Sequence, residues 1–599
     1  MSRSDGEETM MERIKTDVLV VGGSIAGLAT AISAKEAAPS AEVTVVEKYT
    51  SGYAGKANRG AGIVCLLGNY TPKEFVEYHV KNIGKYMNDQ DFLELYASEL
   101  NANVTELDRW SGGKFDKTET GEIRTLKWRS QLRGIDENGV YDFDQDNEYP
   151  WTLAAIDLDF MLELRKHALR LGIKFVDRTG VTDVLTADTP DGGAPGKACG
   201  AVGFDIDTGE TRVFAAKAVV IATGCQNYRI MPMWASARGE GQLAAWRAGA
   251  ALVNGELGAF YNWMSPHNFE SEMGVEYGLY NDKGENVGKP FTAEPHPDID
   301  QDSLAEYYRQ VRAGNGPLHY HPEDNIMTPF TRSMLGSDAA YYKRPFANKW
   351  WGKLIFNAST QQPDDIIIAG LIGEGGNIYV NKEFATTVPG LFAAGDSCYA
   401  GTRGYGAAAV SPGRIRGGGI SFSTFAGRMA GPAAARYASG AAEASDSGAE
   451  GAALDAKIAA IEKRFNAPLS RTGSISVNDF IFEIQKVMEP LGNTLYRDEA
   501  RMKKALGQIL ALKARLDTVE AKTPHHLFGV NEAEAMLFVA ELFFRVSLER
   551  KESIGWFIRE DYPDPPKELR WIMVENNGGE PKFVSEQVRF KDHWFKPEK

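Results

Sequence analysis

The apolar and polar positions of residues 16–48 predict a strand, a helix and a second strand in succession. Residues 17–21 form a short apolar run, and residues 28–35 follow a helical pattern. Residues 41–46 form a second apolar run, which ends at Glu47. Two parallel strands joined by a helix make a βαβ unit, so this stretch predicts part of a parallel sheet.

The turn between the first strand and the helix has the composition of a dinucleotide-binding loop. Glycine is needed there because a Cβ would block the approach of the backbone to a pyrophosphate, which lies at the positive end of the helix. Glu47 comes twenty residues after Gly27, where its carboxylate can accept hydrogen bonds from ribose hydroxyls. Ser24 replaces the middle glycine of G-x-G-x-x-G, and the strand, helix and acid complete the pattern. The nucleotide contacts predicted here are Gly22, Gly23, Ser24, Ile25, Ala26, Gly27, Glu47 and Lys48.

Later segments are expected to continue this sheet and to add helices. A helical period runs through residues 71–110 and through 454–551, with a break at 523–529. Residues 218–224 (AVVIATG) and 390–397 (GLFAAGDS) carry apolar runs followed by glycine, and we expect both to return to the same sheet. Shorter elements are predicted as a helix at 158–171, strands at 174–177, 181–187 and 198–206, a hairpin turn at 207–210 and a helix at 239–251.

Length and charge narrow the class of protein. A chain of 599 residues is too long for one core, so several domains are expected. The net charge of −15 argues against nucleic acid and an anionic membrane surface as partners. The chain opens on polar residues, and the longest late apolar run, 536–546, contains Glu541 and Arg545, so no transmembrane segment is predicted. These features predict a cytoplasmic protein.

The spacing of the four cysteines excludes two further classes of protein. Cys65, Cys199, Cys225 and Cys398 lie far apart, with no C-x-x-C pair. This spacing provides neither a disulfide framework nor the ligands of an iron–sulfur cluster within this chain. No metal site is predicted.

Three distant stretches together form a recognisable set. GGSIAGL with Glu47, AVVIATG at 218–224 and VPGLFAAGDS at 388–397 resemble the fumarate reductase/succinate dehydrogenase flavoprotein superfamily, in which all three contact FAD. The resemblance implies an α/β fold, with a discontinuous Rossmann-like FAD-binding domain, an inserted capping domain and a helical C-terminal domain. It also implies further cofactor contacts by Lys56, Asn58, Arg59, Gly60, Val181, Ala222, Thr223, Gly224, Gly395 and Asp396.

The resemblance also predicts the division of the chain. The expected parts are the first FAD-binding segment (1–252), the capping or substrate domain (253–349), the second FAD-binding segment (350–432), an Ala/Gly/Ser linker (433–453) and a helical C-terminal domain with an extended tail (454–599).

The chain departs from the superfamily pattern at the positions that carry its acid–base chemistry. Residues 49–63 contain no histidine that could attach the flavin, so FAD is expected to be non-covalent. The histidine of the H-P-T-G motif falls in the stretch of Tyr261 and Trp263, and a second family histidine becomes Val410. The resemblance aligns Arg414 with the superfamily arginine that binds a carboxylate. The candidate catalytic residues are Arg414, Tyr261, Trp263 and His267.

These departures argue against fumarate/succinate chemistry as such, and the aromatic pocket looks closer in style to that of adenylylsulfate reductase α-subunits. We expect the catalytic flavoprotein subunit of an oligomer, which exchanges electrons between a small anionic substrate and a ferredoxin-like iron–sulfur partner protein. A stand-alone ene-reductase or dehydrogenase of an unsaturated acid is one alternative. A non-catalytic flavin electron-transfer subunit is the other. No second fingerprint for a nicotinamide nucleotide is found in the sequence.

Overall fold

The computed structural model describes most of the chain. The described residues are 13–58, 62–129, 132–135, 141–143, 148–157, 159–187, 196–230, 237–257, 261–264, 271–272, 278–288, 299–321, 365–371, 373, 377–398, 418–441, 451–472, 475–588, 590 and 594–597.

A seven-stranded sheet forms the centre of the fold, with the strand order β8-β2-β1-β11-β10-β9 and with β19 beside β11. The parallel strands are β8 (Lys174–Val176), β2 (Val43–Val46), β1 (Arg13–Val21), β11 (Thr211–Ile221) and β19 (Leu391–Ala393). The antiparallel strands β10 (Ala198–Asp205) and β9 (Thr179–Thr186) extend the sheet at one side. The second half of β1 and all of β2 are buried, as expected for parallel strands with helices on both faces. The α/β class predicted from the sequence is therefore confirmed.

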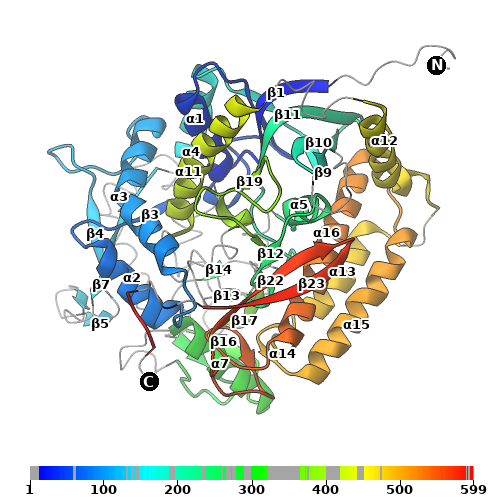
Figure 1. Cartoon of the computed structure of the whole chain (residues 1–599). Coiled ribbons are helices and arrows are strands. Elements are labelled where there is room, and N and C mark those ends of the chain that lie inside the picture. Colours follow the sequence, from blue (N-terminus) through cyan, green and yellow to red (C-terminus); the bar gives the residue numbers. More distant parts are fainter. Residues whose placement is uncertain are drawn as a thin grey trace.

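Two helices lie side by side against this sheet (Figure 1). They are α1 (Ile25–Ala37) and α11 (Gly418–Gly440). A Cβ on Gly427 of α11 would lie 2.6 Å from the Cβ of Ala29 in α1, so the absence of a side chain permits the close approach. Because α11 continues to Gly440, the described part of the predicted linker is helical. The domain boundaries themselves stay a prediction.

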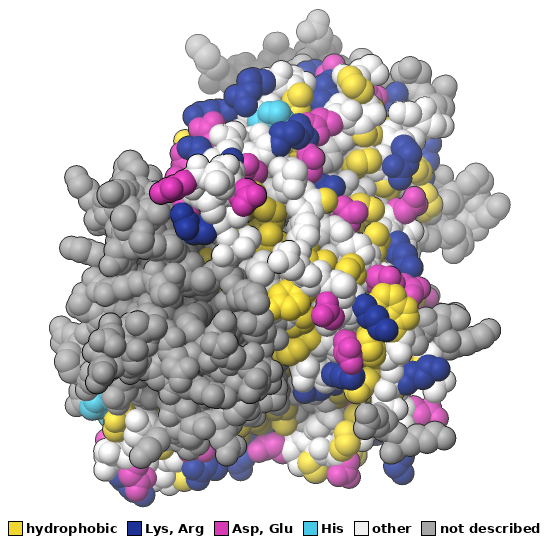
Figure 2. All heavy atoms as spheres, turned by 90° about the vertical axis from the view of Figure 1, so that its left-hand side faces the viewer, with side chains coloured by type: hydrophobic (Ala, Val, Ile, Leu, Met, Phe, Trp, Pro, Cys, Tyr) yellow, Lys and Arg dark blue, Asp and Glu magenta, His cyan; other side chains and the backbone are white. Residues whose placement is uncertain are grey.

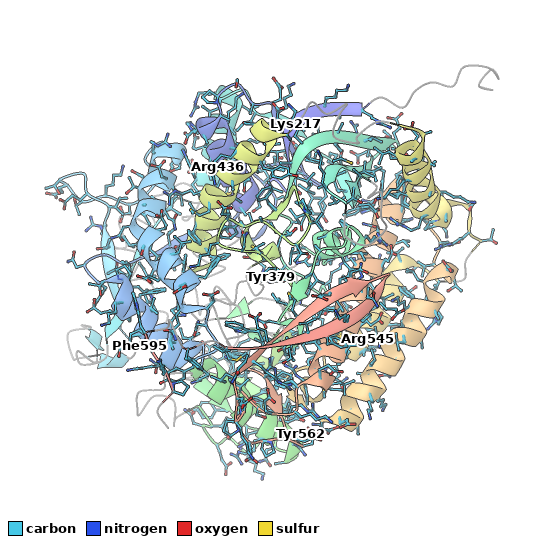
Figure 3. The ribbon with its side chains drawn as sticks, in the orientation of Figure 1. Lys217, Tyr379, Arg436, Arg545, Tyr562 and Phe595 are labelled. Atoms are coloured by element: carbon cyan, nitrogen blue, oxygen red, sulfur yellow. The ribbon has the colours of Figure 1, made fainter. Side chains whose placement is uncertain are left out.

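A second group of elements covers one side of the sheet. It comprises α2 (Pro72–Tyr78), a π-helical turn (His79–Ile83), α3 (Gln90–Ser111), α4 (Phe160–Arg170) and a sheet of β3 (Ile63–Leu66), β7 (Glu148–Ala155) and β4 (Thr125–Arg129), with the pair β5 (Leu132–Ile135) and β6 (Tyr141–Phe143). The C-terminal tail is held here. The N–H of Phe595 donates to Oε1 of Gln90 at 3.0 Å, and its carbonyl accepts from Nε2 at 2.7 Å (Figure 3).

The region predicted as a cap contributes strands to a five-stranded sheet of order β14-β13-β17-β16-β15, whose middle strand β17 lies in the segment predicted as the second FAD-binding part. Its elements are β13 (Tyr261–Met264), β14 (Ser271–Glu272), β15 (Leu279–Tyr280), α7 (Ile299–Arg312), β16 (Leu318–Tyr320) and β17 (Asp365–Leu371). Most of these strands have two to four residues, which is too short to produce a visible alternation in the sequence.

The C-terminal part is rich in helices. It contains α12 (Ala452–Asn466), α13 (Val477–Met488), α14 (Leu491–Thr494), α15 (Glu499–Arg515) and α16 (Pro524–Glu549). The break expected at 523–529 is wrong in part, because Thr523 caps α16 by accepting from the N–H of His526 and the helix begins at Pro524. The tail forms a hairpin of β22 (Arg570–Asn577) and β23 (Glu580–Gln587), which pairs with β12 (Leu252–Val253) and through it with β18 (Asn377–Ile378).

One face of the described part is mixed in charge. Figure 2 shows the side that carries α2 and α3, where Lys and Arg side chains are interspersed with Asp and Glu. Among the described residues, no helix combines the length and apolar content needed to cross a bilayer. The described residues also contain no group of three or more His, Cys, Asp or Glu side chains placed to hold a metal ion.

Candidate functional site

The carboxyl ends of the parallel strands meet at one edge of the central sheet. Just beyond the strands, the N–H of Gly22 donates to the carbonyl of Val46 at 2.7 Å, and the N–H of Ala222 donates to that of Val21 at 2.7 Å. The N–H of Ala394 likewise donates to a carbonyl of β11 at 2.9 Å. The loops that follow β2, β1, β11 and β19 therefore leave from the same edge, which is where ligands bind in open α/β sheets.

The turn after β1 leaves no room for side chains. Gly22 has φ +113°, and a Cβ there would overlap the carbonyl oxygen of Ala222. A Cβ on Gly27 would overlap the carbonyl oxygen of Gly22, and one on Gly23 would overlap the side chain of Ser51. Glycine is therefore required at these positions, because the backbone of the turn, the loop after β11 and Ser51 approach one another too closely for side chains.

The first turn of α1 is suited to an anion. Ser24 occupies the N-cap position without capping the helix through its side chain, and the first turn carries no acidic residue. The N–H groups at a helix start have no partner within the helix, and the helix dipole favours negative charge there. A pyrophosphate over this turn would satisfy both.

Glu47 is fixed directly beside the turn. Its Oε2 accepts the N–H of Gly23 at 2.6 Å, and its Oε1 accepts the N–H of Tyr49 at 3.0 Å. Burial raises the pKa of this carboxyl above its usual value, although both backbone donors and the Lys48 ammonium oppose the rise. The carboxylate is thus held in one orientation at the carboxyl end of β2, where a ribose would lie.

The loop that follows Glu47 crosses the turn. The carbonyl of Gly23 accepts the N–H of Gly52 at 2.9 Å, and a Cβ on Gly55 would overlap the side chain of Ser24. Ser51 anchors this loop to β8, since its hydroxyl donates to Oδ1 of Asp177 at 2.6 Å. The side chain of Asn58 instead donates to the carbonyl of Tyr53 within the loop, at 2.7 Å.

Lys56, Cys225 and Asp396 meet on the β11–β19 side of the turn. Nζ of Lys56 lies 3.1 Å from Sγ of Cys225 and 3.3 Å from Oδ2 of Asp396. Burial tends to lower the pKa of Lys56, but Cys225 and Asp396 outweigh it and raise the pKa. Burial raises the pKa of the Cys225 thiol, against the opposing charge of Lys56. The ammonium is therefore a fixed positive charge in this half of the site.

The loops after β11 and β19 are joined by Ser397. Its hydroxyl accepts the N–H of Gly224 at 3.1 Å and lies 3.5 Å from the hydroxyl of Thr223. Gly395 has φ +65°, and a Cβ there would lie 2.5 Å from the Cβ of Ala26 in the first turn of α1. Segments almost 400 residues apart in the chain thus border one site.

Other predicted residues are placed differently. The side chain of Lys48 forms ion pairs with Glu240 and Glu532. Val181 is half-buried within β9. Trp263 is buried and packs edge-on against Tyr307, with ring centroids 5.6 Å apart. The backbone of Tyr261 pairs with Leu371. Arg59, Gly60, His267 and Arg414 lie outside the described residues, so these assignments stay predictions.

Sequence reasoning missed four side chains of the site. They are Ser51, Asp177, Cys225 and Ser397. Asp177 ends a predicted strand, Cys225 directly follows AVVIATG and Ser397 lies within GLFAAGDS, so a position at the end of a predicted element was the available signal. Ser51 had no such signal, because its role depends on a hydrogen bond to Asp177, which directly follows β8.

The arrangement fits FAD. The turn can receive a pyrophosphate, Glu47 can receive the adenosine ribose on the β2 side, and the β11–β19 side remains for the flavin half. FAD would supply the redox chemistry, and the chain would supply its position and charge environment.

Comparisons with known proteins agree with this fit. The FAD binding domain family matches residues 17–275, and the fumarate reductase flavoprotein C-terminal family matches residues 482–599. A fumarate reductase flavoprotein subunit of Mycobacterium tuberculosis is 24% identical over 582 residues, covering 92% of each chain.

Two solved structures share the fold. An E. coli quinol fumarate reductase matches with a TM-score of 0.73 and 20% identity, covering 98% of this chain and 99% of its own. The adenylylsulfate reductase of Archaeoglobus fulgidus matches with a TM-score of 0.70 and 20% identity, covering 96% of each chain.

Proposed function

Because the chain belongs to the FAD-dependent flavoprotein superfamily of fumarate reductase and succinate dehydrogenase, we propose that it is the catalytic flavoprotein subunit of a reductase complex. It would exchange electrons between a small anionic substrate and an iron–sulfur partner protein. That the chain is an FAD-dependent oxidoreductase follows from its family. The substrate class and the partner are the proposal.

One observation carries the proposal: an FAD-type site is assembled at the carboxyl edge of the sheet in a chain that matches flavoprotein subunits over nearly their whole length. Gly22 and Glu47 of the first βαβ unit and Asp396 of a distant segment border this site. The similarity covers 92% of the mycobacterial relative, which is named as a subunit. This coverage supports the proposal that the chain is the flavoprotein component of an assembly.

The need for a partner is supported by the cysteines. All four are buried, and their spacing in the sequence does not provide cluster ligands. Electrons that reach the flavin must then be passed to or received from another molecule. A ferredoxin-like iron–sulfur protein is the partner that such a flavoprotein would use.

Arg414 is proposed to bind the substrate anion. A guanidinium holds a carboxylate or sulfate through two parallel hydrogen bonds, which a lysine ammonium does not reproduce. With the substrate in hand, Arg414→Ala should raise KM about a hundredfold and Arg414→Lys should recover only part of it. An unchanged KM in Arg414→Ala would show that this arginine has no role in anion binding.

The proposed complex is tested by anaerobic purification of the protein from its own cells. The absorption spectrum and the co-purifying polypeptides are recorded together. A flavin spectrum over a broad iron–sulfur shoulder, with a small second polypeptide, is the expected result. Flavin with no companion chain would contradict it and would favour a stand-alone ene-reductase or dehydrogenase of an unsaturated acid.

A further inference from the structure

Lys48 lies in a buried ionic network that joins the FAD-binding part to the C-terminal helices. Its Nζ is 2.5 Å from Oε1 of Glu240 and 3.2 Å from Oε1 of Glu532. Glu240 begins α5 (Glu240–Arg247), and Glu532 lies in α16. The three side chains are 17%, 8% and 6% exposed, so they interact in surroundings with little water.

Arg238 completes the charge balance. Its backbone N–H donates to Oε2 of Glu240 at 2.7 Å, and its Nε lies 3.9 Å from Oε1 of Glu532. Two cations and two carboxylates thus share one buried space. Burial acts to lower the pKa of Lys48, but Glu240 and Glu532 outweigh it and raise the pKa, so the ammonium stays charged. Removing one partner of such a set leaves an unbalanced buried charge.

Close packing also joins α16 to the FAD-binding part. Nζ of Lys48 lies 5.3 Å from the ring centroid of Phe528 in α16. A Cβ on Gly180 of β9 would be 2.9 Å from Cδ2 of Phe528, and one on Gly239 would be 2.7 Å from Cγ1 of Val539. Helix α16 is therefore seated against the FAD-binding part at several points.

The ionic network lies next to the cofactor site in the sequence. Lys48 directly follows Glu47, whose carboxylate is oriented by Gly23 beside the pyrophosphate turn. Because the two residues share a peptide bond, the network that holds Lys48 also restricts the backbone that carries Glu47. The end of β2 is thus fixed from the C-terminal helices.

We propose that α16 completes the adenosine half of the FAD site: Glu532, together with Glu240, positions Lys48 and thereby Glu47. Glu532 is a positioning residue, since it acts through Lys48 and not on the cofactor directly. The inference rests only on FAD binding and is independent of the substrate and of the redox partner.

Reciprocity follows from the proposal. If docking of α16 favours nucleotide binding, then nucleotide binding must favour docking of α16 by the same factor. ADP is the suitable probe, because it carries the adenosine and pyrophosphate groups and lacks the flavin.

The test measures the affinity of the full-length apoprotein for ADP and for FAD by titration calorimetry. Glu532→Gln should weaken both at least tenfold. Glu534→Gln is the matched control, because Glu534 lies on the same helix and pairs with Arg247 instead. The control should stay within twofold of the wild type. A folded Glu532→Gln protein with wild-type affinity for ADP would overturn the proposal.

A second measurement needs no variant and decides the question if Glu532→Gln does not fold. Hydrogen exchange of the wild-type apoprotein is recorded with and without saturating ADP. Peptides from residues 528–536 of α16 should exchange more slowly with ADP, and those of α15 (Glu499–Arg515) should change less. Equal protection of the two helices, or none in α16, would contradict the proposed role.

Discussion

The N–H of Gly23 donates a 2.6 Å hydrogen bond to Oε2 of Glu47. This bond links the turn after β1 to the acid after β2, so the predicted pyrophosphate and ribose positions are fixed relative to each other. A second bond, from the N–H of Tyr49 to Oε1, prevents rotation of the carboxylate. Pre-organisation of this kind reduces the entropy lost when a ligand is bound.

Glu47→Ala is expected to weaken FAD binding. Loss of a hydrogen bond to a charged group costs about 1.5–3 kcal/mol, which corresponds to an affinity about ten to a hundred times lower. Fluorescence titration of the apoprotein with FAD measures the effect. Glu42→Ala is the control, because its side chain is 53% exposed and pairs with Lys174 at the other end of the same strand. Equal effects of the two substitutions would refute the role given to Glu47.

The ionisation of Glu47 predicts a pH dependence of the apoprotein. Burial raises its folded-state pKa above the ordinary 4.5, while Lys48 opposes the rise and Asp177 adds to it. The protonated group is therefore favoured by folding, and its contribution to stability is full below pH 4.5 and is lost as the pH rises through the raised pKa.

This loss of stability with rising pH is tested by comparison with the Glu47→Gln variant, whose amide side chain does not titrate. The melting temperature of the wild-type apoprotein minus that of the variant should fall over the pH interval that begins at 4.5 and extends to the raised pKa. A difference that is constant or rises over this interval would show that burial of Glu47 does not have the stated effect.

Gly27→Ala is expected to damage the turn. The added Cβ would overlap the carbonyl oxygen of Gly22, which belongs to the rigid backbone of the turn. Overpacking of this kind costs roughly 1–3 kcal/mol, and distortion of the turn should reduce FAD retention as well. Gly507→Ala in α15 is the control, since no atom lies within 4 Å of its Cβ position. Removing that helical glycine should stabilise the protein by about 1 kcal/mol.

Arg550→Ala is expected to destabilise the protein strongly. Arg550 and Glu256 form an ion pair of 2.7 Å in which neither side chain is exposed. Loss of one partner leaves a buried charge and costs about 3–5 kcal/mol. Arg570 provides the comparison, because its side chain is 35% exposed and lies 3.6 Å from Glu552.

Urea denaturation followed by tryptophan fluorescence distinguishes the two arginines. Arg570→Ala should cost at most about 1 kcal/mol, as is usual for an exposed pair. If Arg550→Ala cost no more than this, the Glu256–Arg550 pair would not hold the C-terminal part against the segment that precedes β13.

The βαβ unit was predictable because its signals are local. The strand expected at 17–21 is the second half of β1, and the helix expected at 28–35 lies within α1. β1 begins earlier, at Arg13, because its polar first half pairs with β11. The strand expected from 41 begins at Val43. Apolar periodicity therefore located each element, while pairing with a distant strand set the boundary.

Features that depend on distant contacts were not predictable. The hairpin β22–β23 pairs with β12, which lies more than 300 residues earlier, so the sequence around Trp571 indicated only an ordered tail. The π-helical turn at His79–Ile83 is followed by positive φ angles at Lys85 and Tyr86, which propensities of non-glycine residues do not predict.

The same limit explains the outcome at the cofactor site. Gly22, Gly23 and Glu47 follow a short motif, so their proximity was predictable from spacing. Lys48 was expected to touch the nucleotide, yet its partner Glu532 is 484 residues away. Nothing in the local sequence distinguishes a ligand contact from such an ion pair.

We propose that this chain holds FAD without a covalent link at the carboxyl edge of its main sheet. The most direct measurement is acid precipitation of the purified protein, with chromatography of the supernatant and an absorption spectrum of the pellet. We expect one FAD per chain in the supernatant and a colourless pellet. A flavin that stays with the polypeptide, or a protein that carries no FAD, would contradict the account.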